Sequence, residues 1–365
     1  MRTNPVATRG ARGIRVALGT WAAGAMLATA GCGAPAPIID CVARDGTTPV
    51  CGFQNPEDLA ALSADWLVVS QAPRGDSGGN LLAYRPAADA SPRDARRTLW
   101  PAADSTASEP ASPGCPGPPD EASFVPHGVD RTRDGATLLV VNHGGREAVE
   151  FFEIGRDERG PTLRWVDCVL MPADAMMNDI ASLPDGGFVI SQMASSTVSG
   201  MVALMTGGES GRIHHWPPGG PLRGVPGSEA AGANGVETSA DGRSIYFAEW
   251  VGENFVRMGI DGSDRQAVPL GFNPDNLTWR ANGQLLVGGQ FASPLRAAGC
   301  FDVSEGTCGL GSAAAVIDPE SLAVERVWTH DPATVAGGIS VALEHGDRIW
   351  LGTFGGDRLA WIPAP

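Results

Sequence analysis

The apolar residues of this chain fall into short runs separated by turn residues. One unit recurs along the sequence: a polar residue, a short strand, a turn of Gly, Asp or Asn, and a strongly apolar strand. Its clearest copy is residues 233–250, ANGVETSADGRSIYFAEW, where Asp241-Gly242 can close a tight hairpin between two strands. No sustained 3.6-residue apolar period competes with this pattern, so we expect an all-β protein.

Six copies of the unit occur. In each copy, a residue at the start of the first strand lies seven positions before a residue of the turn, as Asn234 lies before Asp241. The copies begin at Glu57, His127, Asn178, Ala233, Asp275 and Gly338. Hairpin units that repeat in this way predict a six-bladed β-propeller. Two inserts, near residues 86–122 and 291–312, interrupt the spacing, and we expect both to form loops.

If the copies are blades, the starts of their first strands meet around one axis. The expected column holds Asp58, His127, Asn178, Asn234, Asp275 and Gly338; the next holds Leu59, Gly128, Asp179, Gly235, Asn276 and Ile339; and Glu57 stands just before the first. Asn and Asp are common at turns and strand edges, but a whole column of them favours a shared role. Carboxylate and amide oxygens without thiolates suit Ca²⁺, so we expect a central divalent-cation site.

The hairpin centred on Asp134-Gly135 bears on two histidines. His127 and His143 are equidistant from residue 135, so we expect them to be cross-strand neighbours on the face that carries the polar column. Two imidazoles beside a cation site can act as a general base and its orienting or proton-shuttling partner. The same reasoning places Glu249 opposite Asn234, with Gly235 letting the backbone crowd the axis. Trp250, Phe291 and Phe354 are candidates for the wall of an apolar pocket.

At these residues the sequence resembles the paraoxonase/arylesterase family of calcium-dependent lactonases, within the broader group of SMP-30/gluconolactonase-like and strictosidine-synthase-like propellers. The resemblance covers residues 53 to about 290, through Glu57-Asp58-Leu59, Pro126-His127-Gly128-Val129, Leu139-Val140-Val141-Asn142-His143, Asn178-Asp179-Ile180, Ala233-Asn234-Gly235 and Asp275-Asn276. It implies a carboxylic-ester hydrolase that acts on small molecules, either lactones or aryl esters.

The resemblance also implies roles for single residues. A catalytic Ca²⁺ would be held by Glu57, Asn178, Asn234, Asp275 and Asn276. A second, structural Ca²⁺ would be held by Asp58, Asp179 and the backbone carbonyl of Val129. His127 would be the general base, paired with His143.

The chain departs from that family in two places. It has Met193-Ala194-Ser195 where paraoxonases carry an Asp-His pair, and no cysteine follows Cys308 to link the first and last blades. Two other functions stay open: a non-catalytic, calcium-stabilised binding module, and a gluconolactonase-like sugar lactonase that uses another divalent metal. The histidine pair favours the lactone or aryl-ester hydrolase over the binding module, because a structural cation does not need two facing imidazoles.

Composition limits the partners and the compartment. The net charge is −15 and the chain contains no Lys, which disfavours nucleic-acid binding. Residues 1–31 combine four Arg with a short apolar run, Val16 to Ala30, and read as an export signal before a single domain at 32–365. Cleavage can follow Ala28-Thr29-Ala30, or Gly31-Cys32 can serve as a bacterial lipobox that leaves Cys32 lipidated.

We therefore expect a protein exported from a bacterial cell, either periplasmic or anchored to the membrane by lipid, or alternatively secreted. The six other cysteines allow 15 disulfide pairings. Cys41–Cys51 and Cys300–Cys308 are the natural local pairs, which leaves Cys115–Cys168. No CxxC pair occurs, which disfavours a thiolate zinc site.

Overall fold

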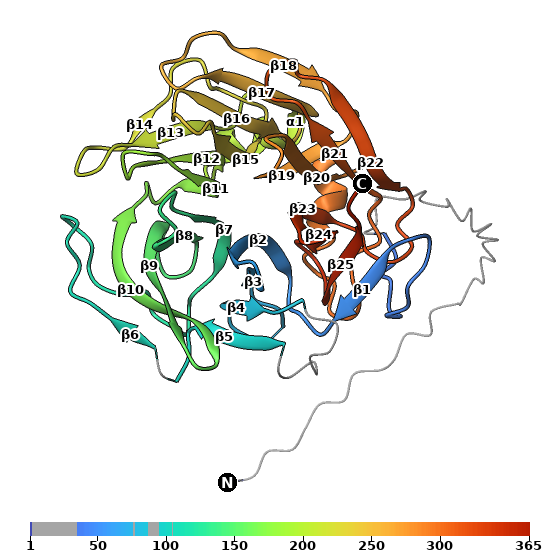
Figure 1. Cartoon of the computed structure of the whole chain (residues 1–365), viewed down its shortest axis with the longest axis horizontal. Coiled ribbons are helices and arrows are strands. Elements are labelled where there is room, and N and C mark those ends of the chain that lie inside the picture. Colours follow the sequence, from blue (N-terminus) through green and yellow to red (C-terminus); the bar gives the residue numbers. More distant parts are fainter. Residues whose placement is uncertain (2–34, 76, 87–94, 104) are drawn as a thin grey trace. The chain divides into compact units, whose positions relative to one another are not determined.

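The computed structural model describes Met1 and residues 35–75, 77–86, 95–103 and 105–365. From residue 35 onward these residues belong to one compact unit, Gly33–Pro365, which forms a β-propeller of six blades (Figure 1). The predicted fold class is confirmed. The expected export signal and Cys32 lie outside the described residues.

Each blade is an antiparallel sheet whose first strand lies nearest the axis. Blade 1 comprises β2 (Pro56–Ser63), β3 (Trp66–Gln71), β4 (Asn80–Tyr84) and β5 (Arg96–Trp100). Blade 2 comprises β7 (Pro126–Arg131), β8 (Thr137–Asn142), β9 (Ala148–Asp157) and β10 (Gly160–Leu170), with the short β6 (Thr106–Ala107) parallel to β10. Blade 3 comprises β11 (Ala175–Ser182), β12 (Phe188–Ser195), β13 (Arg212–Trp216) and β14 (Arg223–Gly224).

The remaining blades follow the same order. Blade 4 comprises β15 (Ala233–Thr238), β16 (Ser244–Glu249), β17 (Asn254–Gly259) and β18 (Gln266–Pro269). Blade 5 comprises β19 (Asn273–Trp279), β20 (Leu285–Gln290), β21 (Ser312–Ile317) and β22 (Val324–His330). Blade 6 comprises β23 (Ile339–His345), β24 (Arg348–Thr353), β25 (Arg358–Pro363) and β1 (Thr48–Cys51).

The ring is closed by a strand. β1, from the start of the domain, pairs antiparallel with β25, from its end, so blade 6 takes its strands from both. Arg358 on β25 is fully buried and donates hydrogen bonds to the carbonyl oxygens of Ile38 and Asp40, which hold the segment before β1 in place. Closure therefore needs no disulfide between the first and last blades.

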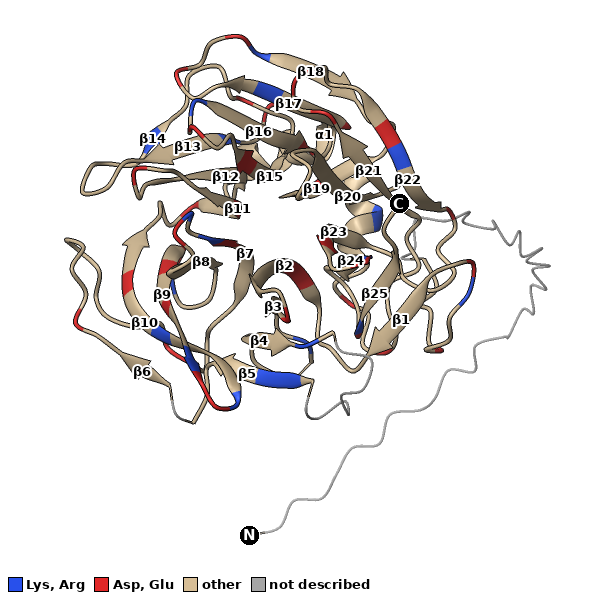
Figure 2. Ribbon diagram, viewed as in Figure 1, with Lys and Arg blue, Asp and Glu red and all other residues tan. Residues whose placement is uncertain are grey.

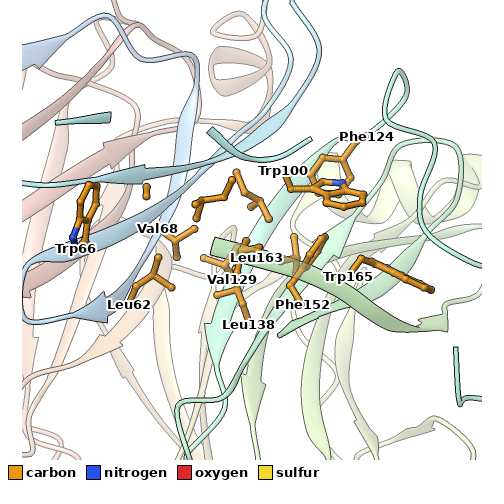
Figure 3. Packing of buried hydrophobic residues seen from close by; sticks show 14 of the residues in the cluster. Leu62, Trp66, Val68, Trp100, Phe124, Val129, Leu138, Phe152, Leu163 and Trp165 are labelled. Carbon is orange, nitrogen blue, oxygen red and sulfur yellow. The ribbon is translucent and has the colours of Figure 1, made fainter. Parts of the chain in front are cut away.

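The hydrophobic core lies between neighbouring blades. Between blades 1 and 2, Val68 and Trp100 pack in one buried cluster with Val129 and Phe152 (Figure 3). The rings of Trp100 and Phe152 meet edge to face with their centroids 5.2 Å apart. Burial of each such side chain stabilises the fold by about 1.5–3 kcal/mol. Similar clusters at the other five interfaces hold the inner strands around the axis.

The inner strands carry β-bulges, which correct the register expected from the sequence. The ladder slips between Pro126 and Val129 in blade 2 and between Ala233 and Val236 in blade 4. Matching slips occur in the other blades. Glu249 therefore pairs with Ala233 and not with Asn234. His143 lies beyond the end of β8, so it is not the ladder partner of His127.

The bulges also redefine the axial columns. They align Glu57, His127, Asn178, Asn234, Asp275 and Ser340 in a first ring, and Asp58, Gly128, Asp179, Gly235, Asn276 and Val341 in a second. The expected first column was thus displaced in the first and last blades, where it named Asp58 and Gly338. A bulge turns an extra residue out of the ladder, so that two successive side chains of one strand can serve the channel.

The two inserts are more structured than expected. The segment 86–122 contributes β5 to blade 1 and β6 to blade 2. The segment 291–312 contains α2 (Pro294–Ala298) and the Cys300–Cys308 disulfide. All three expected pairings form, since Cys41–Cys51 and Cys115–Cys168 are also bonded. Three disulfides are typical of an oxidising compartment. Among the described residues, no helix is long and apolar enough to cross a membrane.

Candidate active site in the central channel

The first ring of axial residues forms the floor of a cavity of about 560 Å³. Its floor residues come from the bulges of blades 1 to 5 and are Glu57, His127, Asn178, Asn234 and Asp275. Figure 2 marks acidic positions in red on the inner strand β2. All five were predicted from the sequence as candidate site residues, and the structure brings them together at one end of the channel.

Three oxygens of this floor, and one of Asn276, which adjoins Glu57, are buried without a hydrogen-bond partner. They are Glu57 Oε2, Asn178 Oδ1, Asn234 Oδ1 and Asn276 Oδ1. A buried polar atom without a partner costs about 1–3 kcal/mol, so four in one place call for a ligand that accepts lone pairs. Mixed carboxylate and amide oxygens are the donors that Ca²⁺ prefers. Among the described residues, no group of three or more His, Cys, Asp and Glu side chains could hold a metal ion, and three of these four oxygens belong to amides.

The acids of the floor are destabilised as anions. Burial raises the pKa of Glu57 well above its ordinary range, and the neighbouring charges of Asp58 and Asp275 raise it further. Burial likewise raises the pKa of Asp275 to about 7, against a hydrogen bond from Gln290 that lowers it. A cation among these groups would favour their ionised forms, so the electrostatics and the unpartnered oxygens point the same way.

The second ring faces a smaller cavity of about 210 Å³, which extends along the inner strands towards the hairpin turns. Asp58, Asp179 and Val129 line it, so the structure separates them from the first set. Asp58 accepts hydrogen bonds from the N–H groups of Leu59 at 2.8 Å and Val129 at 2.7 Å. Burial raises its pKa to about 7.

Asp179 repeats this arrangement two blades further on. It accepts hydrogen bonds from Ile180 at 2.8 Å and from Val236 at 2.8 Å. Burial raises its pKa well above the ordinary range, and the charge of Asp58 adds to the effect. Each aspartate therefore ties its own inner strand to the strand of the next blade. The role of these three residues in holding a second Ca²⁺ stays a prediction.

Glycine allows the inner strands to approach this closely. A Cβ on Gly235 would lie 2.3 Å from the carbonyl oxygen of Asp275, and a Cβ on Gly128 would lie 2.6 Å from that of Asn178. The expectation that Gly235 lets the backbone crowd the axis is confirmed. Gly128 does the same between blades 2 and 3.

The two histidines meet at the edge of the floor. Their rings are in edge-to-face contact, with centroids 5.0 Å apart. The Asn178 amide lies 3.2 Å from His127 Nε2 and donates to it when that nitrogen carries its lone pair. Burial and, to a lesser extent, the neighbouring His143 lower the pKa of His127 to about 3. His127 is therefore neutral at pH 7, with a lone pair directed towards the floor.

Two polar residues of this site were missed by the sequence analysis. An oxygen of Glu147 lies 2.9 Å from His143 Nδ1. Both residues belong to a loop without a recognisable sequence motif, so the contact could not be predicted. Gln290 donates to Asp275 Oδ2 at 2.5 Å and accepts from Trp250 Nε1 at 2.8 Å. A signal for Gln290 existed, since the second strands of blades 1 and 3 carry Gln at similar positions, Gln71 and Gln192.

The cavity above the floor has mainly apolar walls. Trp250 and Phe354 line it as expected, whereas Phe291 packs outside it against Phe272. The helix α1 (Val198–Thr206) and α2 stand at its rim. The wall includes five methionines, Met176, Met177, Met193, Met201 and Met205.

No protein-family model matches the sequence, and no curated protein matches it either. Among solved structures, the fold is similar to a gluconolactonase from Xanthomonas campestris, at 18% identity and a TM-score of 0.52 over 92% of this chain and 98% of that chain. It is also similar to a luciferin-regenerating enzyme, at 11% identity and a TM-score of 0.52 over 87% of this chain and 95% of that chain. At such identities the likeness establishes the propeller fold, and function has to be argued from the site.

Proposed function

We propose that the protein is a calcium-dependent hydrolase of lactones and aryl esters. The observation that carries the proposal is the contact of two imidazoles, His127 and His143, beside buried oxygens that lack partners. A propeller that only binds a structural cation has no use for a neutral histidine aimed at that cation's site. The resemblance to the paraoxonase/arylesterase family agrees with this assignment.

The donor set fits Ca²⁺. Glu57, Asn178, Asn234, Asp275 and Asn276 would hold the cation of the active site. When bound, Ca²⁺ supplies a Lewis acid that polarises the carbonyl of the substrate and stabilises the developing oxyanion.

The histidines would move the proton. His127 would accept a proton at Nε2 from a water molecule in the cavity and would release the hydrogen bond that Nε2 accepts from Asn178, while the oxygen of that water bonds to the carbonyl carbon. The C–O bond of the ester would then break, and the leaving alkoxide or phenoxide would take up the proton that the histidine pair had accepted from water. Because the low pKa of His127 makes its imidazolium form unfavourable, His143 beside it can share the proton.

A gluconolactonase-like sugar lactonase is the second candidate, and the fold of the Xanthomonas campestris gluconolactonase favours it. The methionine-rich wall favours a less polar substrate, since it offers few partners to the hydroxyl groups of a sugar. The three disulfides agree with an exported protein. A lipid anchor on Cys32 remains part of the proposal.

A hydrolysis panel tests this function. Aliphatic lactones, aryl esters, gluconolactone and a phosphotriester are offered with and without Ca²⁺ to the wild type and to His127→Gln. We expect calcium-dependent turnover of the first two classes, with kcat reduced about 10²–10⁴-fold in the variant. Preferential turnover of gluconolactone would favour the second candidate, and no turnover of any carboxylic ester would refute both.

A further inference from the structure

Glu147 contacts one histidine of the pair and the strand β11 that carries Asn178. It lies in the loop between β8 and β9, and its side chain is only 11% exposed. Both of its oxygens lie within hydrogen-bond distance of His143 Nδ1, at 2.9 and 3.0 Å. Oε1 also accepts a hydrogen bond from the backbone N–H of Met177 at 2.8 Å. The carboxylate therefore bridges blade 2 and the first strand of blade 3.

We propose that Glu147 is a positioning residue for the His127–His143 pair. Its carboxylate accepts the Nδ1–H of His143, which fixes the tautomer of that ring and leaves Nε2 as its only lone pair. The same negative charge stabilises the imidazolium when His143 takes up a proton. This inference rests on the proposed hydrolase function and gives His143 its orientation.

The second contact of Glu147 strengthens the assignment. Met177 directly precedes Asn178, whose amide lies 3.2 Å from His127 Nε2. By holding the N–H of Met177, the carboxylate fixes the start of β11 and with it the side chain that orients His127. Glu147 thus reaches the pair through two routes: directly at His143, and through Asn178 at His127.

The tautomer of His143 gives the first test, which needs neither a variant of Glu147 nor a substrate. The full chain is labelled with ¹⁵N-histidine, and the His143 signals are assigned by their loss in His143→Gln. We expect Nδ1 of His143 to carry a proton at neutral pH. A neutral His143 protonated at Nε2 and not at Nδ1 would overturn the proposal.

Kinetics give the second test. Glu147→Gln keeps an oxygen for Met177 but removes the charge, so we expect kcat to fall roughly 10–100-fold while KM changes by less than about threefold. Glu153→Gln is the matched control, because Glu153 lies on β9 and pairs with Arg164 outside the channel. Calcium affinity of both variants is measured by calorimetry and should equal that of the wild type.

The outcomes separate this inference from the function on which it rests. Unchanged kcat in Glu147→Gln, with an active wild type, refutes the positioning role alone. A rise in KM or a weaker calcium affinity at constant kcat would assign Glu147 a structural role and also refute it. If the wild type hydrolyses no ester, the proposed function fails, and the tautomer of His143 still decides whether Glu147 fixes that ring.

Discussion

At the scale of residues, the same side-chain type takes different roles according to its neighbours. Asn178 and Asn234 occupy equivalent bulge positions, and each has a buried Oδ1 without a partner. The amide of Asn178 also contacts His127, so Asn178 would serve both the proposed cation site and the proposed base. Asn234 is hydrogen-bonded to Asp275, and in the proposed site it would act only as a cation ligand. Asn234 is thus the cleaner probe of calcium binding.

Asn234→Ala removes one buried oxygen donor without introducing a clash. We expect the calcium Kd to rise at least about 10-fold, since ligand and outer-shell changes at metal sites commonly cost 10–100-fold. The calcium-free variant should keep the stability of the calcium-free wild type to within about 1 kcal/mol, because the loss of an unsatisfied oxygen offsets the loss of the hydrogen bond to Asp275. Calorimetric titration and thermal melting measure both quantities.

The control for this change is Asn282→Ala in an exposed hairpin turn. It should bind calcium like the wild type. Normal calcium binding by the Asn234 variant would show that this asparagine is not a calcium ligand and has only a structural role in the bulge.

At the scale of elements, the sequence predicted the hairpins but not the bulges. Turns such as Asp241-Gly242 have a local signature, so the six units and their order could be read directly. The bulges of this chain have no such local sequence signature. Each depends on the close approach of a neighbouring inner strand, which the sequence does not reveal. The column was therefore misaligned in blades 1 and 6, although the resemblance still assigned Glu57 and Asp58 to different sites.

Contacts between elements could not be predicted from the sequence either. Glu147 acquires its role from Met177, which lies 30 positions away in the next blade. Gln290 acquires its role from Trp250 and Asp275, which the fold alone brings together. Such partners depend on blade packing and have no spacing rule in the sequence.

Gly235→Ala tests the close approach of the inner strands. The new Cβ would lie 2.3 Å from the carbonyl oxygen of Asp275, so β15 and β19 must separate. We expect a loss of about 1–3 kcal/mol in the free energy of unfolding, as for an overpacked core, together with weaker calcium binding. Urea unfolding in the absence and presence of Ca²⁺ measures both effects.

Gly78→Ala is the matched control, because a Cβ there has no heavy atom within 4 Å. If both variants were as stable as the wild type, the space between β15 and β19 would accommodate a Cβ, and the fold would not require glycine at position 235.

At the scale of the whole molecule, the ring concentrates negative charge on its axis. Buried acids from three blades have raised pKa values, and Asp58 and Asp275 are raised to about 7. The blade interfaces and the closing strand β1 hold these groups together against their mutual repulsion. A bound cation would relieve that repulsion, so we expect the stability of the ring to depend on calcium and on pH.

The calcium-free protein should lose stability as the pH rises from about 4 to 7. Asp58 and Asp275 have a pKa of about 7 in the folded state, above the ordinary aspartate value, so the folded state binds more protons than the unfolded state in that window. Each group contributes a slope of up to about 1.4 kcal/mol per pH unit. Saturating Ca²⁺ should remove most of the slope. The lowered pKa of His127 has the opposite effect below about pH 6.5, so thermal melts of the calcium-free wild type are compared with those of Asp275→Asn. The same pH slope in both proteins would contradict the raised pKa of Asp275.

The dependence of hydrolysis on calcium is tested by the rate of lactone or aryl-ester hydrolysis before and after chelation, with loss of the metal verified by elemental analysis. We predict that metal removal abolishes turnover and that added Ca²⁺ restores it, since the oxyanion then regains its stabilising charge. Undiminished hydrolysis by verified metal-free protein would contradict the account.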